Sequence, residues 1–242
     1  FSRYKRGTLV RRIQHRMQLY GLQEMEAYVG RLRADPGEVR ALANDLLISV
    51  TNFFRDRAAF ALIEREVIPQ LFEGKTAGEP VRVWVAGCAT GEEAYSLAIL
   101  LLEYAYRTKE GHSVQVFATD LSEAALQRAR EGFYPETIAE DISPERLARF
   151  FTQEKGGYRV RKEVREIVLF APHNLLKDPP FSKVDLISCR NVLIYLEREV
   201  HPQLLDIFHY ALRPQGWLLL GTAEVVDGSS GFRTVNRKQS LY

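Results

Sequence analysis

The chain has few of the residues and patterns that mark several common protein classes. It contains two cysteines and five histidines, too scattered to build a metal site or a disulfide framework. No apolar run approaches the roughly 20 residues that cross a bilayer, and no secretory signal opens the chain. We therefore expect a cytoplasmic protein with no metal, no disulfide bond and no direct membrane insertion.

The size and composition fit a globular protein. With 242 residues, 46% hydrophobic and 26% charged, the chain is long enough for one large α/β domain, with or without a small helical domain. It starts at Phe1 instead of Met, which is typical of a piece of a longer protein. We expect a monomer, and a fusion to further domains stays open.

Positive charge gathers near the N-terminus although the net charge is only +2. Residues 1–34 have a charge balance of +6, from Arg3, Lys5, Arg6, Arg11, Arg12, Arg16, Arg31 and Arg33 against Glu24 and Glu26. A basic face of this kind favours an acidic partner. An ordinary solvated helix surface explains the same charges, so both interpretations stay open.

Apolar spacing divides the chain into two parts. Residues 1–73 repeat apolar side chains at helical intervals and predict an all-helical N-terminal domain. Residues 74–80, GKTAGEP, are rich in turn formers and predict a linker. Residues 81–242 alternate strand and helix patterns, which predicts an α/β domain with a mostly parallel sheet.

The α/β rhythm is regular except in one place. Strands are expected at 81–86, 114–120, 166–172, 184–190 and 213–222, with helices at 92–107, 122–132 and 197–212. Residues 134–165 interrupt this alternation with a short helical pattern and a hairpin-like GGYRV. A small inserted subdomain is the simplest interpretation of this break.

The stretch from Val81 to Tyr104 carries the strongest functional signal. An apolar strand ends at Gly87, Gly91 follows, and Glu92 and Glu93 open a helix. Glycine allows the backbone to approach a ligand closely, and parallel sheets bind adenosine cofactors at this edge. Two carboxylates in the first helical turn would repel a pyrophosphate, whereas they suit the positive charges of S-adenosylmethionine (SAM). NAD, or a turn needed only for packing, remains the alternative.

Other strand ends carry polar groups that suit the same ligand. Asp120 closes the second strand and could accept both ribose hydroxyls. Asn174 follows the third strand and could present its amide to the adenine edge. Residues 189–192 follow the fourth. Because the carboxyl ends of parallel strands meet at one edge, we expect these groups to lie together; each alone could also be a cap or turn residue.

At these residues the chain resembles a known family, the CheR family of SAM-dependent chemoreceptor glutamate methyltransferases. The motifs that carry the resemblance are TNFFRD (51–56), GCATGEEAYSLA (87–98), ATDLS (118–122), HNLL (173–176) and CRNVLIY (189–195). The resemblance covers nearly the whole chain. It implies a helical N-terminal domain, a Rossmann-like methyltransferase domain, and a small antiparallel β-subdomain at about 134–165. The implied reaction esterifies glutamate side chains on chemoreceptor cytoplasmic helices, and the product of the cofactor is S-adenosylhomocysteine.

The resemblance also implies a set of site residues. Asp120 would bind the ribose, Glu93 would meet the methionine amino group, and Asn174 with Leu175 would flank the adenine. The implied cofactor residues are Ser49, where several members have Asn, with Thr51, Arg55, Gly87, Glu93, Asp120, Asn174, Leu175, Asn191 and Val192. The loop at Gly156 looks short beside members that bind a receptor's C-terminal pentapeptide, so a tether-independent enzyme is implied.

Such a reaction does not require the protein to transfer a proton. A glutamate is already an anion at pH 7, so it needs no general base, and in-line positioning is the expected source of catalysis. Arg55 could clamp the carboxylate of the cofactor or of the substrate, and Tyr195 could orient the acceptor by a hydrogen bond. Both could equally be structural, as a salt-bridged arginine and a core tyrosine.

The basic helices then have an expected partner. Methylated receptor helices are rich in glutamate, so Arg11, Arg12 and Arg16 are predicted to dock on the chemoreceptor cytoplasmic domain, weakly at high salt. Two other classes stay open. One is an RNA methyltransferase, although the chain lacks an obvious aromatic stacking platform and no nucleic acid is expected. The other is a cofactor-binding signalling module within a larger sensory protein.

Overall fold

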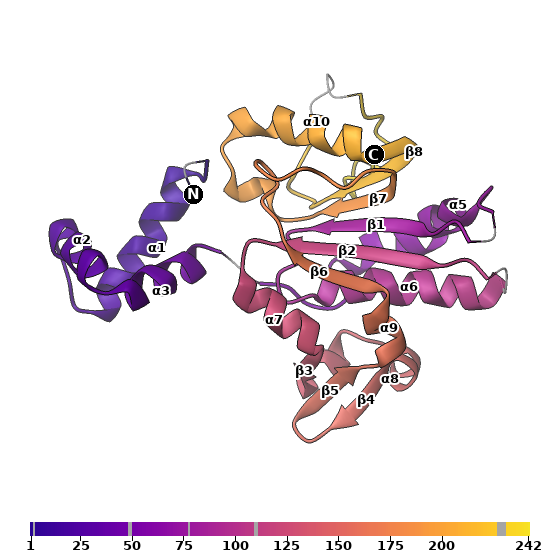
Figure 1. The fold of residues 1–242 in the computed structure, drawn as a ribbon, viewed down its shortest axis with the longest axis horizontal. Helices are drawn as coiled ribbons and strands as arrows, with labels where there is room; N and C mark the ends of the chain where they lie inside the picture. The colour runs from indigo at the N-terminus through magenta and orange to yellow at the C-terminus, as the bar shows by residue number, and fades with distance from the viewer. Residues whose placement is uncertain (2, 48–49, 77, 109–110, 227–230) are drawn as a thin grey trace.

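A single parallel sheet forms the centre of the structure, and a group of helices lies to one side of it (Figure 1). The computed structural model describes residues 1, 3–47, 50–76, 78–108, 111–226 and 231–242. Within these ranges no helix combines the length and apolar character needed to cross a bilayer.

The central sheet has five parallel strands in the order β6-β2-β1-β7-β8. Their bounds are Val81–Ala86 (β1), Val114–Asp120 (β2), Val168–Pro172 (β6), Val184–Cys189 (β7) and Leu212–Leu220 (β8). Beyond β8, Leu218 and Tyr242 exchange backbone hydrogen bonds of 3.0 and 2.9 Å, which adds a short antiparallel pairing at the C-terminal end. The expected mostly parallel, Rossmann-like sheet is confirmed.

Alternate side chains of β1 serve two cores, as the pleat of a strand requires. Val83 and Val85 join the cluster that packs against α6 (Glu92–Thr108). Trp84 joins the second cluster, which packs against α10 (His201–Ala211). Because both faces are covered, the central strand is almost entirely buried and its sequence is a continuous apolar run.

A near-continuous helical stretch from residue 57 to 72 packs on the α6 side of the sheet. It consists of α4 (Arg57–Leu62), a π-helical turn (η1, Ile63–Val67) and α5 (Ile68–Phe72). Its apolar side chains, together with Phe53 and Phe54, belong to the same core cluster as the strands. The sequence analysis placed these residues in the N-terminal domain; their packing supports a different boundary, proposed below.

The expected small antiparallel insertion is present between β2 and β6. After α7 (Glu123–Glu131), it comprises a three-stranded sheet in the order β3-β5-β4 with short helices around it. The bounds are Phe133–Pro135 (β3), Glu136–Glu140 (η2), Pro144–Phe150 (α8), Phe151–Glu154 (β4), Gly157–Val160 (β5) and Lys162–Glu166 (α9). In Figure 1 this subdomain lies at the bottom, away from the N-terminal helices.

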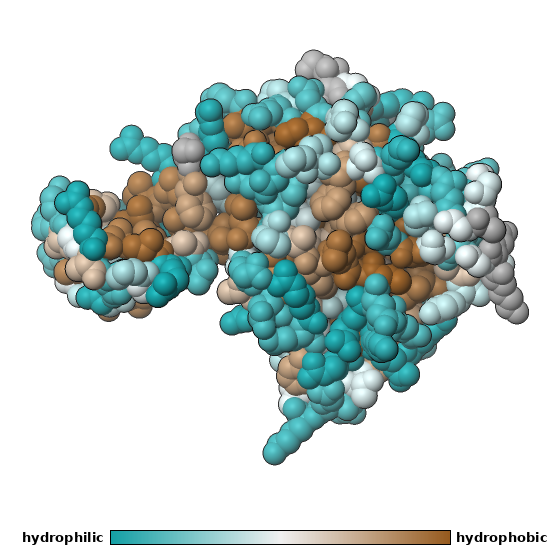
Figure 2. All heavy atoms as spheres, in the orientation of Figure 1, coloured by the Kyte–Doolittle hydropathy of each residue, from teal (hydrophilic) through white to brown (hydrophobic). Residues whose placement is uncertain are grey.

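The N-terminal helices form a bundle around a buried carboxylate. α1 (Arg6–Leu19) and α2 (Met25–Ala34) both pack on α3 (Pro36–Leu46). The Glu38 side chain is fully buried and accepts hydrogen bonds from Arg16, Tyr20 and Tyr28. Apolar side chains also gather on the visible face of this bundle (Figure 2).

Candidate functional site

The loop after β1 crosses over the carboxyl end of β2. The N–H groups of Gly87 and Cys88 both donate to the carbonyl oxygen of Thr119, at 2.8 and 2.9 Å. Gly87 has a φ of +76°, and a Cβ at this position would lie 2.4 Å from Cγ2 of Val192. Only glycine fits here. The contact also brings together Gly87 and Val192, two residues predicted to line the cofactor.

Asp120 lies beside this loop with its carboxylate already oriented. One oxygen accepts the N–H of Ala89 at 2.8 Å and the other accepts the N–H of Ser122 at 2.8 Å. Ala89 adopts a φ of +48°, a strained conformation for a residue with a side chain. Each carboxylate oxygen retains a further acceptor position, so Asp120 can still bind a pair of neighbouring hydroxyls.

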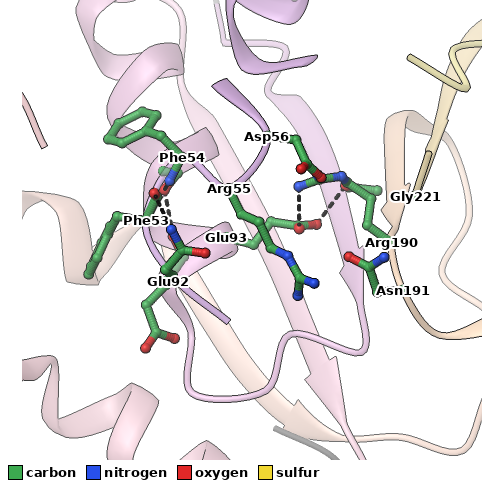
Figure 3. A network of polar contacts seen from close by, with 12 residues as sticks. Phe53, Phe54, Arg55, Asp56, Glu92, Glu93, Arg190, Asn191 and Gly221 are labelled. Atoms are coloured by element: carbon green, nitrogen blue, oxygen red, sulfur yellow. Dashed lines mark hydrogen bonds and ion pairs between the residues drawn. The ribbon is translucent and has the colours of Figure 1, made fainter. Parts of the chain in front are cut away.

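A buried ion network lies next to the loop (Figure 3). The Arg190 side chain is 1% exposed and pairs with Glu93 at 3.0 Å and with Asp56. The hydroxyl of Ser188 donates to the other oxygen of Glu93 at 2.7 Å. The network joins the segment before α4, the first turn of α6 and the end of β7, so it holds three separate parts of the site in one arrangement.

The network constrains how Glu93 could serve a ligand. Its two oxygens each accept one protein hydrogen bond, and a carboxylate has about four acceptor positions. An ammonium group can therefore still bind it. Its neighbour Glu92 accepts from the hydroxyl of Thr90 at 2.7 Å, and burial raises the pKa of Glu92 above its usual range.

The TNFFRD segment is fixed to the methyltransferase core through its two phenylalanines. The N–H of Phe54 donates to the hydroxyl of Ser96 on α6 at 3.0 Å, and the Phe53 ring packs edge-on against Tyr134 and Phe151. This anchoring leaves the next residue, Arg55, half-buried beside the ion network (Figure 3).

Arg55 and Thr51 lie on the segment that leads into α4. One guanidinium nitrogen of Arg55 donates to the carbonyl oxygen of Val50 at 2.8 Å. The other N–H groups of the guanidinium are not used in this bond. Thr51 is half-buried on the same segment. Ser49, the remaining cofactor residue expected here, lies outside the residues that the structure describes.

The strand end after β6 carries Asn174 and Leu175. The Asn174 side-chain oxygen accepts the N–H of Leu176 at 3.1 Å, and the backbone N–H of Asn174 donates to Asp178 at 2.7 Å. The turn therefore holds Asn174 in place through its oxygen, so its amide NH₂ is the group suited to an adenine edge. Leu175 packs against the α10-side core cluster.

The loop after β7 carries Asn191, Val192 and Tyr195, and a buried carboxylate shapes it. Glu224 is 3% exposed and accepts the N–H groups of Asn191 at 2.9 Å, Ile194 at 3.1 Å and Gly221 at 2.7 Å. Asn191 has a φ of +59°, which these bonds help to maintain. Glu224 is therefore a positioning residue for the loop.

The three arginines expected to dock on a receptor differ from one another. Arg11 is exposed and Arg12 is half-buried on α1. Arg16, in contrast, pairs with Glu38 at 2.5 Å and with Asp45 at 3.3 Å inside the helical bundle. Glu38 raises the pKa of Arg16, so the guanidinium stays charged, and the paired carboxylates compensate this charge within the fold. The structure thus gives Arg16 a stabilising role in the helical bundle.

Two stretches of the chain each match a known protein family. Residues 49–240 match the family described as "CheR methyltransferase, SAM binding domain", and residues 1–47 match "CheR methyltransferase, all-alpha domain". The chain belongs to the CheR methyltransferase family. The resemblance stated from the motifs is therefore confirmed, as is SAM as the cofactor of its larger domain.

Similar proteins span several bacteria. The chain is 35% identical to a putative methyltransferase Cher3 of Pseudomonas putida, over 95% of this chain and 84% of that protein. It is 34% identical to a chemotaxis protein methyltransferase of Escherichia coli, over 91% and 77%. An uncharacterized 104.1 kDa protein of Rhodobacter capsulatus is 43% identical over 100% of this chain, which spans only 26% of that relative. Neither alternative, an RNA methyltransferase or a signalling module, is favoured by these similarities.

The CheR site described above fits SAM by the chemistry of its donors and acceptors. Asp120 offers an oriented carboxylate beside the Gly87 loop, where the absence of a Cβ lets Val192 pack against the glycine. Glu93 offers negative charge for an ammonium group, and Arg55 offers positive charge for a carboxylate. Asp120, Glu93 and Arg55 therefore offer partners for the ribose hydroxyls, the ammonium group and the carboxylate of the cofactor.

The sequence analysis gave no individual role to four residues of this site, namely Asp56, Ser188, Arg190 and Glu224, although Asp56 lies in the TNFFRD motif and Arg190 in the stretch 189–192. A weak signal existed for Arg190, because a charged residue directly follows an apolar strand at its carboxyl end. For Glu224 the signal was similar, three residues beyond the Gly221 that ends the next apolar strand. Their partners lie far away in the chain, so spacing alone could not pair them.

Proposed function

We propose that this chain transfers the methyl group of SAM to glutamate side chains on the cytoplasmic helices of a chemoreceptor. The observation that carries the proposal is the match of the chain, in both its parts, to the CheR methyltransferase family. Relatives at 34% identity are named chemotaxis protein methyltransferases, and this supports a receptor as the substrate. We place the reaction in the cytoplasm.

The reaction is a displacement that needs no proton transfer. When bound, SAM supplies an electrophilic methyl group: a carboxylate oxygen forms the new C–O bond, the S–C bond breaks, and sulfur keeps the electron pair. The substrate is already an anion near neutral pH. Burial raises the pKa of the Cys88 thiol well above its usual range, so this neighbour of the glycine turn stays protonated and is no competing nucleophile.

The protein's contribution is then to hold the reacting groups in line and to exclude water. We assign Asp120 to the ribose, Glu93 to the methionine ammonium group, and Asn174 with Leu175 to the adenine. Asn191 and Val192 line the reacting end on a loop that Glu224 holds in shape. Gly87 lets the backbone come close to the ligand, and Thr51 lines the cofactor site as well.

Arg55 and Tyr195 are the proposed catalytic residues. Arg55 lies next to the ion network, half-buried and with one donor held by Val50, so its remaining donors can clamp a carboxylate. Tyr195 is half-buried on the loop after β7, where its hydroxyl can orient the acceptor. Arg55→Ala and Tyr195→Phe should lower turnover strongly while the unfolding temperature changes little.

The packing supports a domain boundary near residue 48 in place of 73. We propose that the N-terminal domain consists of α1, α2 and α3 alone. Residues 53–72 would then belong to the methyltransferase domain, because their apolar side chains lie in the core cluster of the sheet. Residues 74–80 would be a connection within that domain instead of an interdomain linker, and about 134–165 its β-subdomain.

The docking surface needs a matching revision. We propose that Arg11 and Arg12 face the glutamate-rich receptor helices, and that exposed cations near the N-terminus, such as Arg3, take this role in place of Arg16. Arg12→Glu should reduce methylation of receptor fragments at low salt and matter less at high salt, since exposed charges are screened over about 10 Å at 0.1 M. Methylation that is indifferent to both salt and this substitution would refute the docking proposal.

Two measurements test the proposed function. Isothermal titration of the full chain with SAM and S-adenosylhomocysteine should show binding that Asp120→Ala abolishes or weakens more than tenfold, because a carboxylate hydrogen-bonded to hydroxyls contributes about 1.5–3 kcal/mol per bond. Tritiated methyl groups should then pass to glutamates of a chemoreceptor cytoplasmic fragment, as base-labile esters. Binding without transfer would support the signalling-module alternative, and transfer to RNA would overturn the proposal.

A further inference from the structure

The short segment before α1 lies along the loop that carries Tyr195. The N–H of Lys5 donates to the carbonyl oxygen of Tyr195 at 2.9 Å, and the N–H of Glu197 donates to the carbonyl oxygen of Arg3 at 2.9 Å. Tyr4 and Leu196 face each other as an antiparallel bridge between these bonds. The start of the N-terminal domain is therefore hydrogen-bonded directly to the loop at the end of β7.

The side chain of Tyr4 lies on the same side of the molecule as part of the proposed cofactor wall. It is half-buried and packs against the α10-side core cluster, the cluster that Leu175 and Val192 also contact. The Phe1 ring meets the Tyr4 ring edge-on, with 5.1 Å between centroids. Tyr4 is thus held by the Phe1 ring and by the α10-side core cluster.

The ionisation of Tyr4 is sensitive to the groups of the site. Burial raises the pKa of the Tyr4 phenol above its usual range, and the negative charge of Asp120 and the neighbouring Tyr195 raise it further. The phenol therefore stays neutral at physiological pH, and it lies within electrostatic reach of the carboxylate assigned to the ribose. A neutral phenol offers a hydrogen-bond donor together with an aromatic face.

We propose that Tyr4 forms one wall of the cofactor site, contacts bound SAM on its adenosine side, and thereby lets the cofactor hold the N-terminal domain against the methyltransferase domain. This inference rests on the SAM-dependent function proposed above. The inference implies that cofactor binding and docking of residues 3–5 are energetically coupled. By linkage, each event favours the other by the same factor.

Substitution of Tyr4 in the full chain tests the contact. Isothermal titration should give a dissociation constant for SAM and for S-adenosylhomocysteine at least fivefold higher in Tyr4→Ala, and two- to threefold higher in Tyr4→Phe, which keeps the ring and loses only the hydroxyl. Tyr210→Ala is the matched control. Tyr210 is 73% exposed near the end of α10, which leads into the amino end of β8, at the opposite edge of the sheet from the site.

Hydrogen exchange tests the coupling in the wild-type chain and in Tyr4→Ala. Saturating SAM should slow exchange of the Lys5 and Glu197 amides in the wild-type chain, and Tyr4→Ala should abolish this slowing. The inference is overturned if these amides exchange at the same rate with and without SAM, or if Tyr4→Ala binds SAM within twofold of wild type. In either case the SAM-dependent function would stand. A wild-type chain that binds no SAM would defeat both.

Discussion

Replacing Arg190 by methionine should destabilise the whole protein, because it leaves a carboxylate inside the structure without its cationic partner. Arg190 is 1% exposed and pairs with Glu93, which is 13% exposed, and with Asp56, which is 39% exposed. Methionine keeps much of the volume and removes the charge. Asp56 can turn to solvent, whereas Glu93 remains partly buried with Ser188 as its remaining described partner.

The expected cost follows from that asymmetry. Removing one partner of a buried ion pair typically costs about 3–5 kcal/mol. Since only Glu93 is left inside, we expect about 3 kcal/mol for Arg190→Met, at the lower end of this range. The added substitution Glu93→Gln should recover at least half of the loss, because a neutral amide can be buried with its Ser188 hydrogen bond and without a charge.

Urea unfolding followed by circular dichroism measures these free energies directly. The control is Arg65→Met, whose ion pair with Glu66 is 71% and 43% exposed and should change stability by about 0.5 kcal/mol or less. If Arg190→Met and Arg65→Met were equally stable to within about 1 kcal/mol, the buried network would not be the structural link described here. The same conclusion would follow if Glu93→Gln worsened the loss.

Three further substitutions or conditions have defined outcomes. Gly87→Ala should cost about 1–3 kcal/mol and weaken SAM binding, because its Cβ would lie 2.4 Å from Val192 at a positive φ; unimpaired titration with SAM would contradict this. Arg16 lowers the pKa of Glu38 from 4.5 to about 2, so the ionised form stabilises the fold; up to about 3 kcal/mol should be lost as the pH falls from 4.5 towards 2, and an unfolding curve of Glu38→Gln should lack this drop. Glu224→Gln places an amide NH₂ against backbone N–H groups, so stability should fall by about 1–3 kcal/mol and the KM for SAM should rise; wild-type values of both would show that the carboxylate does not position its loop.

The edge of the sheet was predictable because its residues follow local rules. A few neighbouring positions are enough to recognise each feature: an apolar strand followed by glycine, and an acidic residue at the end of the next strand. Parallel topology then brings Gly87 and Asp120 together, and the structure joins their loops through the N–H of Ala89. Periodicity was likewise sufficient for the strands and for most helices.

What the sequence did not reveal depends on partners distant in the chain. Arg16 looked like one more exposed cation, because nothing in the spacing of α3 marks Glu38 as a buried acid. Residues 57–72 are helical, as predicted, but helical spacing says nothing about which core a helix joins. Glu224 accepts N–H groups from a loop some thirty residues earlier, and no local pattern encodes such a bond.

The buried network of Arg190 also has a consequence for the order of folding. Its two ion pairs join residues separated by 97 and 134 positions in the chain, contacts with a high entropic cost of loop closure. They can form only after β1, β7 and the segment before α4 have come together. We therefore expect substitutions in this network to accelerate unfolding and to leave the refolding rate almost unchanged.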